Sequence, residues 1–378
     1  MDGFRLGSIS GFEIRIDFSW FVIVFLILWS FSAGVFPQRF PGLATGTYLA
    51  MGTAGAVLFF TSLLAHELSH SVVARSRGIP VAGITLFIFG GLARTGAEAS
   101  TPEDELVIAG VGPLCSVALG FLFHVLHQVG VVAGWPLPVT GVARYLGFLN
   151  FVLAGFNLLP GFPLDGGRLF RALAWKATGD LTRATRWASD GGRILGYTLV
   201  TLGVIQVLGG LVVGGLWLVF IGWFLRTAAV FSFQQHVLRG VLRGVEARRV
   251  MTPHPTTVSP GLSLEDLVEE RFLRDPYQSY PVLDRYGVVG LVTLDQVKST
   301  PRDRWAHTRV GDVMTTPPGL LVSPESSLVD ILERMAETKS NRVMVMADGK
   351  LVGVISPSDV SRWIQREQMI ADLKERPR

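Results

Sequence analysis

Residues 63–70 read Leu-Leu-Ala-His-Glu-Leu-Ser-His, which places an HExxH pentad inside an apolar run. On a helix, His66 and His70 are four residues apart, so their side chains lie on one face, one turn apart. Two imidazoles on one face can hold a zinc ion, and the intervening Glu67 can act as general base toward metal-bound water. Residues 52–65 carry no charge. The pattern therefore predicts metal chemistry at membrane depth.

The composition of the 378-residue chain indicates several membrane spans. The chain is 49% hydrophobic and 17% charged, against about 25% charged residues in average soluble domains. The single cysteine, Cys115, excludes an internal disulfide framework and a cysteine-rich zinc site, and we interpret it as a small core residue. The net charge of +4 comes without a basic run, so we expect no nucleic-acid partner. Glu13 and Asp17 precede a first apolar run that is long enough to span, so we expect no cleaved signal peptide.

Four apolar segments and one longer charge-free stretch predict about six transmembrane helices. They are Phe18 to about Val35, residues 48–75, Leu106 to about Val125, Ala143 to about Leu159, and residues 194–225. One straight helix over the last stretch would be about 48 Å long, against a hydrocarbon core of about 30 Å. The glycine pairs at 209–210 and 214–215 therefore predict a hairpin of two spans there, and five spans in all is the alternative. Arg75 and Arg77 follow the pentad, which predicts that it lies toward the cytoplasmic side.

Two shorter segments predict strands. Residues 1–17 alternate polar and apolar side chains, which is typical of a strand or hairpin on the membrane face. Residues 79–97 are rich in β-branched and aromatic residues before Gly90-Gly91, and they are too short to span as a helix. In the polar link at 97–105, Thr101 with the acidic residues after it predicts a helix start.

A catalytic zinc usually has three protein ligands, so a third ligand is expected from elsewhere in the chain. Asp165 is the best candidate, because it lies in a helix break at residues 160–167 that contains two prolines and three glycines. We expect the helix to resume at Leu169. An ionisable residue at membrane depth indicates a functional site, although a proton relay or a packing pair is the alternative. We expect His124 and His127 to anchor the interface rather than to bind metal.

The pentad, followed by Asn157-x-x-Pro160-x-x-Pro163-Leu164-Asp165-Gly166-Gly167, resembles the site-2 protease family of intramembrane zinc metalloproteases. The resemblance covers roughly residues 1–230. It implies one Zn2+ per chain with three ligands, His66, His70 and Asp165. It also implies that Glu67 is the catalytic acid/base. The implied substrate is a spanning segment of another membrane protein.

The same resemblance implies a substrate-positioning role for a second set of residues. They are Asn157, Pro160, Pro163, Gly90 and Gly91. The segment Phe87–Thr95 is similar to the family's membrane-associated sheet, where an unwound substrate would add as an edge strand. The chain has no insertion long enough for the PDZ domain that many relatives carry.

From about Arg239 the chain is soluble in character and repeats itself. Residues 250–253 correspond to 313–316, and residues 289–293 correspond to 352–356. The pattern of each copy predicts five elements in the order strand, helix, strand, strand, helix. The repeat resembles a tandem pair of CBS domains. The expected division is a transmembrane protease domain at 1–235, a linker at 236–246, CBS domains at 247–300 and 307–366, and a charged tail at 367–378.

The CBS resemblance implies binding of ATP or another adenine nucleotide, which would gate the attached enzyme. The family's ribose-binding pattern is Gly-h-x-Ser/Thr-x-x-Asp, where h is apolar. The second copy matches it at Gly353, Ser356 and Asp359. The first copy keeps Gly290 and Thr293 but has Gln296 where the aspartate is expected, so one cleft should be weak or empty. A purely structural or dimerising module, with a homodimer formed through the CBS domains, is the alternative.

The sequence thus predicts a multi-pass α-helical membrane protein with about six transmembrane helices and a small membrane-associated β-sheet, followed by a soluble α/β tandem CBS domain. The predicted function is regulated intramembrane proteolysis in the plasma or inner membrane, with the CBS module in the cytoplasm. The competing class is a CBS-gated ion transporter or channel whose path is lined by the same four polar side chains, although such a path does not need HExxH spacing. A protease-like scaffold without turnover is a third hypothesis, and the intact Glu67 argues against it.

Overall fold

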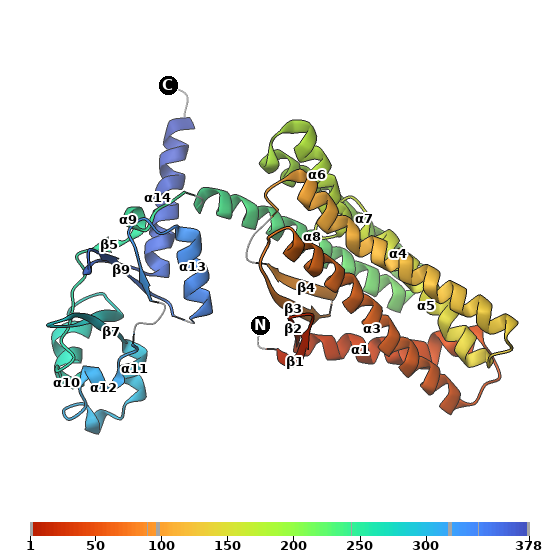
Figure 1. Ribbon diagram of the computed structural model, residues 1–378, viewed down its shortest axis with the longest axis horizontal. Coiled ribbons are helices and arrows are strands. Elements are labelled where there is room, and N and C mark those ends of the chain that lie inside the picture. The colour runs from red at the N-terminus through yellow and green to blue at the C-terminus, as the bar shows by residue number, and fades with distance from the viewer. Residues whose placement is uncertain are drawn as a thin grey trace. The chain divides into compact units, whose positions relative to one another are not determined.

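The computed structural model describes residues 3–88, 90–95, 99–242, 244–316, 320–338 and 340–375. Parts of the predicted polar link at 97–105 and of the predicted charged tail lie outside these residues. The chain divides into two compact units, Met1–His236 and Val237–Arg378 (Figure 1).

Within the described residues, six helical segments of the chain are long and apolar enough to cross a bilayer. The first is continuous through α1 (Phe18–Trp29), the π-helical turn η1 (Ser30–Val35) and α2 (Phe36–Arg39). The others are α3 (Thr45–Ser76), α4 (Pro102–Val132), α5 (Leu137–Asn157), α7 (Leu181–Leu208) and α8 (Val212–Leu242). The prediction of about six spans is confirmed. The other helices extend beyond the predicted segments, while α5 begins at Leu137 rather than at Ala143 and ends at Asn157 rather than at about Leu159.

The predicted hairpin of the last two spans turns at the first glycine pair, where Gly210 has a φ of +89°. The second pair lies inside α8 and has a different role. A Cβ atom on Gly215 would lie 2.5 Å from the carbonyl oxygen of Gly203 on α7. A Cβ atom on Gly222 would likewise lie 2.6 Å from the carbonyl oxygen of Gly196. These glycines therefore let the two helix backbones pack closely, as small residues do between transmembrane helices.

The short helix α6 (Asp165–Thr178) follows the helix break, and the prediction that the helix resumes at Leu169 is wrong. We had interpreted Gly166 and Gly167 as helix breakers, but both lie in the first turn of α6. A Cβ atom on Gly166 would lie 2.3 Å from the carbonyl carbon of Leu158, and one on Gly167 would lie 2.4 Å from that of Gly161. The glycines allow the helix to start against the preceding loop, so Asp165 becomes its first residue.

A four-stranded sheet lies beside α3 in the order β1-β2-β3-β4 (Figure 1). Its strands are β1 (Phe4–Ile9), β2 (Phe12–Ile16), β3 (Val81–Phe87) and β4 (Gly90–Thr95). Strands β2 and β3 are parallel, and the other two pairs are antiparallel. Alternate residues of β2 are buried, and Ile14 packs with Ile84 against Leu64 and Leu68 of α3. The sheet therefore packs on the helix that carries the pentad, and β4 is an edge strand.

The second unit contains the two predicted copies. The second copy has the predicted order, as β8 (Leu321–Val322), α13 (Leu328–Glu337), β9 (Val343–Ala347), β10 (Lys350–Ile355) and α14 (Pro357–Glu375). The first copy departs from it at the beginning, because its first strand is only an isolated bridge at Val258. The rest of the first copy is α10 (Leu264–Leu267), η2 (Val268–Phe272), β6 (Ser279–Asp284), β7 (Gly287–Thr293) and α11 (Leu294–Ser299).

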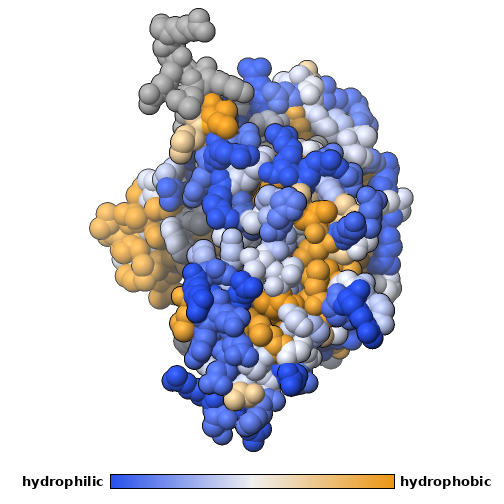
Figure 2. All heavy atoms as spheres, turned by 90° about the vertical axis from the view of Figure 1, so that its left-hand side faces the viewer, coloured by the Kyte–Doolittle hydropathy of each residue, from blue (hydrophilic) through white to orange (hydrophobic). Residues whose placement is uncertain are grey.

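The two copies exchange short segments. Strand β5 (Thr252–Pro253), at the start of the first copy, pairs with β10 of the second copy. Thr315, near the start of the second copy, bridges to Leu291 of β7 in the first copy. Each copy keeps its own hydrophobic core. Short helices complete the unit, namely α9 (Ala247–Val250), η3 (Arg302–Arg304) and α12 (Val310–Val313). The face of this unit that Figure 2 shows is largely hydrophilic, as expected for a soluble domain.

Candidate functional site

Three potential metal ligands converge where α3 meets the start of α6. They are His66 and His70 of the pentad and Asp165. The Oδ2 atom of Asp165 lies 3.1 Å from Nε2 of His66 and 3.2 Å from Nε2 of His70. The two Nε2 atoms are 3.3 Å apart. Tetrahedral zinc with bonds of about 2.0–2.1 Å would have ligand–ligand separations of about 3.3 Å. The structure thus brings the predicted third ligand to the histidine pair, and this donor set fits zinc.

The other ring nitrogen of each histidine is held by α4. The carbonyl oxygen of Ile108 lies 2.6 Å from Nδ1 of His70, so this nitrogen donates and a neutral ring keeps its Nε2 lone pair free. The hydroxyl of Ser116 lies 2.8 Å from Nδ1 of His66. Such partners orient metal-ligating imidazoles and fix their tautomers. Helix α4 therefore points both Nε2 atoms at the same place as Asp165.

Gly112 leaves room for the two imidazoles on the same face of α4. A Cβ atom at this position would lie 2.1 Å from Nε2 of His70 and 2.7 Å from Nε2 of His66. The sequence alone does not assign Gly112 or Ser116 to the site. Their spacing of four residues on one helix face was the signal that could have linked them.

Glu67 lies against the edge strand β4. The backbone N–H of Gly91 donates a hydrogen bond to its carboxylate. A Cβ atom on Gly91 would lie 2.4 Å from Cγ of Glu67. Glycine at this position therefore lets the strand backbone reach the carboxylate directly. Gly91, which was predicted to position a substrate, thus contacts Glu67. Gly90 begins β4 with a φ of +131°.

A buried ion pair fixes α6 to α4. Arg171 of α6 donates two hydrogen bonds to the same oxygen of Glu105, and the one from its Nε atom is 2.7 Å long. The two residues are 8% and 1% exposed, respectively. The start of α4 is capped as predicted, with the Thr101 side chain accepting from the Asp104 amide. Because Asp165 is the first residue of α6, the pair also positions that carboxylate relative to the histidines.

The remaining predicted positions lie around the helix break. Asn157 is the last residue of α5, and within the described residues its side chain has no hydrogen-bond partner. Pro160 and Pro163 are exposed. The loop between them packs tightly on α7, where a Cβ atom on Gly161 would lie 2.5 Å from the Gly192 nitrogen. The side chains predicted to position a substrate are therefore accessible, while the loop that carries them is anchored.

His127 is part of the packing between α4 and α5. Its Nδ1 atom lies 2.9 Å from the carbonyl oxygen of Thr140. Within the described residues, the group of His, Cys, Asp or Glu side chains close enough to share a metal does not include His124 or His127.

The second unit contains a cleft of about 360 Å³ that is lined by both copies. Asp359 lies in its wall. Its Oδ2 atom accepts from the Ser356 amide at 2.8 Å, and its Oδ1 atom accepts from the Thr252 hydroxyl at 2.8 Å. Burial raises the pKa of Asp359, but these hydrogen bonds outweigh burial and hold the pKa below its usual value. Arg342 and Arg362 also line the cleft, and Arg362 forms an ion pair with Asp359, so the cleft combines an ionised carboxylate with one paired and one further cation.

Gln296 takes the place of this carboxylate in the first copy. Its Oε1 atom accepts from the Thr293 amide at 2.8 Å, and its Nε2 atom donates to the Thr315 hydroxyl at 2.6 Å. The first copy thus repeats the local hydrogen-bond pattern without the charge. Gly290 and Gly353 are equivalent too, because a Cβ atom on either would lie within 2.6 Å of a methionine sulfur.

Comparisons with known proteins agree with this architecture. The model of peptidase family M50 matches residues 54–135 and 134–199, and that of the CBS domain matches 247–300 and 310–366. Rip3 from Mycobacterium tuberculosis is 38% identical over 366 residues, which cover 96% of this chain and 93% of Rip3. This chain belongs to peptidase family M50, the site-2 protease family.

A second M50 relative is the zinc metalloprotease MJ0392 of Methanocaldococcus jannaschii. It is 32% identical over 321 residues, which cover 84% of this chain and 87% of that protein. The solved site-2 protease from Methanocaldococcus jannaschii is 27% identical, with a TM-score of 0.41, and the match covers 61% of this chain and 95% of that one. Membership of the family makes this multi-pass membrane protein a zinc metalloprotease with tandem CBS domains, so the predicted fold class and enzyme class are confirmed.

Ser116→Ala is expected to weaken zinc binding about 10–100-fold, because the His66 ring loses the partner that orients it. Competition with a chelator of known affinity measures this loss. Ser71→Ala is the matched control, since its buried hydroxyl bonds only the backbone oxygen of Glu67. Equal zinc affinity in the two variants would contradict an orienting role for Ser116.

Proposed function

We propose that the chain cleaves the spanning segment of another membrane protein, at the site formed by His66, His70 and Asp165. The observation that carries this proposal is the convergence of these three ligand atoms beside the Glu67 carboxylate, within a multi-pass unit. The three residues would hold the zinc ion. When bound, zinc polarises a carbonyl group and lowers the pKa of a water molecule.

Glu67 supplies the acid/base function in this proposal. Its carboxylate oxygen takes a proton from the attacking water and passes it to the nitrogen of the leaving amine. The hydrogen bond from the Gly91 amide keeps the carboxylate next to the histidine pair. One residue of the pentad thus handles both proton transfers, while its neighbours His66 and His70 serve only as ligands.

The substrate is captured in an extended form. A spanning helix shields its carbonyl groups in hydrogen bonds, so a substrate segment must unwind before it is cut. Strand β4 is the last strand of its sheet and can pair with an added strand. Because Gly91 of β4 touches Glu67, a segment paired with β4 would lie close to the reacting groups. The Asn157 side chain offers a further hydrogen-bonding group.

Reconstitution of the full chain with a single-span peptide in liposomes tests the proposed reaction. We expect one zinc ion per chain and cleavage within the apolar segment, with loss of activity after chelation and recovery after zinc is returned. Cleavage that persists in the fully chelated protein would contradict the proposal. Zinc flux without any cleavage would favour the transporter hypothesis instead.

We place the metal site and the CBS pair toward the cytoplasm. Basic residues gather at the end of the helices that carries the metal site, namely Arg75, Arg77, Arg168, Arg171 and Lys176. Such an excess is typical of cytoplasmic helix ends. With six spans, both ends of the first unit then lie on this side.

One adenine nucleotide per chain is the regulator in this proposal, and it binds in the cleft that contains Asp359. The carboxylate would accept hydrogen bonds from a ribose diol, and Arg342 and Arg362 would attract the phosphates. Gln296 offers a neutral amide at the equivalent position, so the first copy does not provide a second strong site. Nucleotide binding is expected to change the cleavage rate.

Asp359→Asn is expected to weaken binding of ATP, ADP or AMP about tenfold or more, because a hydrogen bond to a charged group contributes about 1.5–3 kcal/mol. Calorimetry on the full chain measures the change, and Gln296→Ala should leave affinity unchanged. Since hydrogen bonds lower the pKa of Asp359, its charge persists as pH falls and is lost only below its usual titration range near ~3.9. Affinity should therefore be flat from about pH 8 to about pH 5 if Asp359 alone titrates. Equal losses in the two variants would exclude this cleft as the nucleotide site.

A further inference from the structure

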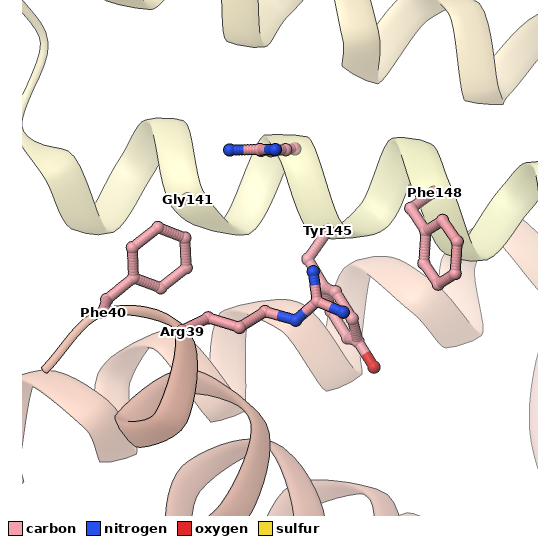
Figure 3. Close-up of a pocket in the computed structure, with 6 residues that line it drawn as sticks. Arg39, Phe40, Gly141, Tyr145 and Phe148 are labelled. Carbon is pink, nitrogen blue, oxygen red and sulfur yellow. The ribbon is translucent and has the colours of Figure 1, made fainter.

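A second pocket lies in the first unit, away from the metal site. It has a volume of about 340 Å³ and is lined by the end of α2 and by α5. Arg39 and Phe40 come from the α2 side, and Gly141, Arg144, Tyr145 and Phe148 come from α5 (Figure 3). Helix α3 begins close after the pocket at Thr45 and reaches His66 about 31 Å farther along its axis. The pocket and the metal site are therefore near opposite ends of that helix.

Two arginines give this pocket an uncompensated positive charge. No acidic residue occurs between Asp17 and Glu67, or between Glu105 and Asp165, so the chain around the pocket contains no carboxylate. Within the described part of the chain, neither Arg39 nor Arg144 forms an ion pair. Both side chains are exposed. A cationic pocket of this kind would attract an anion from outside the chain.

Aromatic rings orient one of the two cations. The Arg39 guanidinium lies 5.4 Å from the centre of the Tyr145 ring and 6.0 Å from that of Phe148. Figure 3 shows Arg39 reaching from α2 across Tyr145. A guanidinium that stacks on rings keeps its N–H edges available, and their fork geometry matches the oxygens of a phosphate group.

The pocket continues into an apolar face of α5. Phe148, Phe151 and Val152 are 52%, 37% and 48% exposed, respectively, and follow Arg144 at helical spacing. In a membrane-spanning helix such side chains face the acyl chains of the lipid. The surface thus joins a cationic pocket to an apolar stripe along one helix. The pocket is complementary to the anionic headgroup of a phospholipid, and the stripe is complementary to its acyl chains.

We propose that this pocket binds the phosphate headgroup of an anionic phospholipid, whose acyl chains lie along the exposed face of α5. The bound lipid bridges Arg39 and Arg144. Because the segment Phe18–Arg39 is the least buried of the six candidate spans, such a bridge ties the most loosely packed span to α5. The end of the first span and α5 are already in close contact beside the pocket, since a Cβ atom on Gly141 would lie 2.8 Å from the Phe40 ring.

Native mass spectrometry of the full chain, exchanged between phosphatidylglycerol and phosphatidylcholine, tests this proposal. We expect retained phosphatidylglycerol in the natural sequence and about 25-fold weaker retention in the double variant Arg39→Gln/Arg144→Gln, since each arginine near an anionic lipid contributes about fivefold. Arg183→Gln is the matched control, because its exposed guanidinium also stacks on a ring, at 5.2 Å from Trp187, but lies outside the pocket. It should retain phosphatidylglycerol as the natural sequence does.

Several outcomes would overturn the proposal. Equal retention of the two lipids, or equal loss in the control variant, would show that the pocket does not select an anionic headgroup. Displacement of the lipid by inorganic phosphate alone would identify the ligand as a soluble anion. Arginine-dependent binding of a peptide only through its free carboxylate would assign the pocket to a protein terminus. If the double variant does not fold, judged by zinc content, Arg144→Gln alone should still lose about fivefold.

Discussion

Glu67→Gln is expected to lower the rate of peptide cleavage by a factor of about 10²–10⁴ or more, while zinc content and fold stay unchanged. The amide has nearly the shape of the carboxylate, but it cannot take a proton from water. The proposed metal ligands are untouched, because His66, His70 and Asp165 all remain. Time courses of cleavage in liposomes, together with zinc analysis of the same samples, measure both quantities.

The matched control for this variant is Glu103→Gln. Its carboxylate is exposed on the first turn of α4 and pairs with Lys176 at 2.8 Å, so its loss should leave cleavage unaffected. If Glu67→Gln still cleaves at the rate of the control, another group is the base and the proposed mechanism is wrong. A loss of zinc in Glu67→Gln would instead point to a role in building the site.

Gly112→Ala is expected to abolish zinc binding, and cleavage with it. The added methyl group would lie 2.1 Å from Nε2 of His70, the atom that faces Asp165. The expected loss of zinc affinity is at least the ~10–100-fold that removal of an orienting partner causes. Metal analysis after purification and chelator competition both measure the effect.

Gly110→Ala separates this clash from a general effect on α4. It lies two residues away on the same helix, and its added Cβ atom would meet nothing closer than 3.8 Å. This control should bind zinc normally. Normal zinc binding in both variants would mean that α4 does not approach the histidines as the structure describes.

The sequence allowed the three converging side chains that we propose as zinc ligands to be named, because each has a local signal. The pentad has the spacing of a helix face, and Asp165 is a charge inside a break rich in proline and glycine. The residues that orient these ligands have no such signal. Gly112 and Ser116 look like ordinary packing residues until the register between α3 and α4 is known. That register depends on side-chain packing along two helices, which a single sequence does not specify.

The same limit explains the errors around the helix break. Glycines after proline usually end a helix, so we placed the start of α6 too late. Gly166 and Gly167 are there because the loop backbone lies against them. Likewise, the ion pair of Glu105 with Arg171 joins residues whose separation in the sequence gives no hint of contact. By contrast, hydrophobicity alone was sufficient to predict the spans, since the bilayer requires about 20 apolar residues per helix.

The exchange of β5 and Thr315 between the two CBS copies has a consequence for synthesis on the ribosome. Strand β5 is made at the start of the first copy, yet its partner β10 is the last of the described strands to emerge. The first copy likewise lacks its bridge from Thr315 until the second copy has begun. The first copy therefore cannot complete its pairing before the second copy is made, and β5 stays unpaired until β10 emerges; non-local pairing of this kind slows folding. The membrane helices leave the ribosome first, so a complete CBS unit would be the final part of the newly made protease to form.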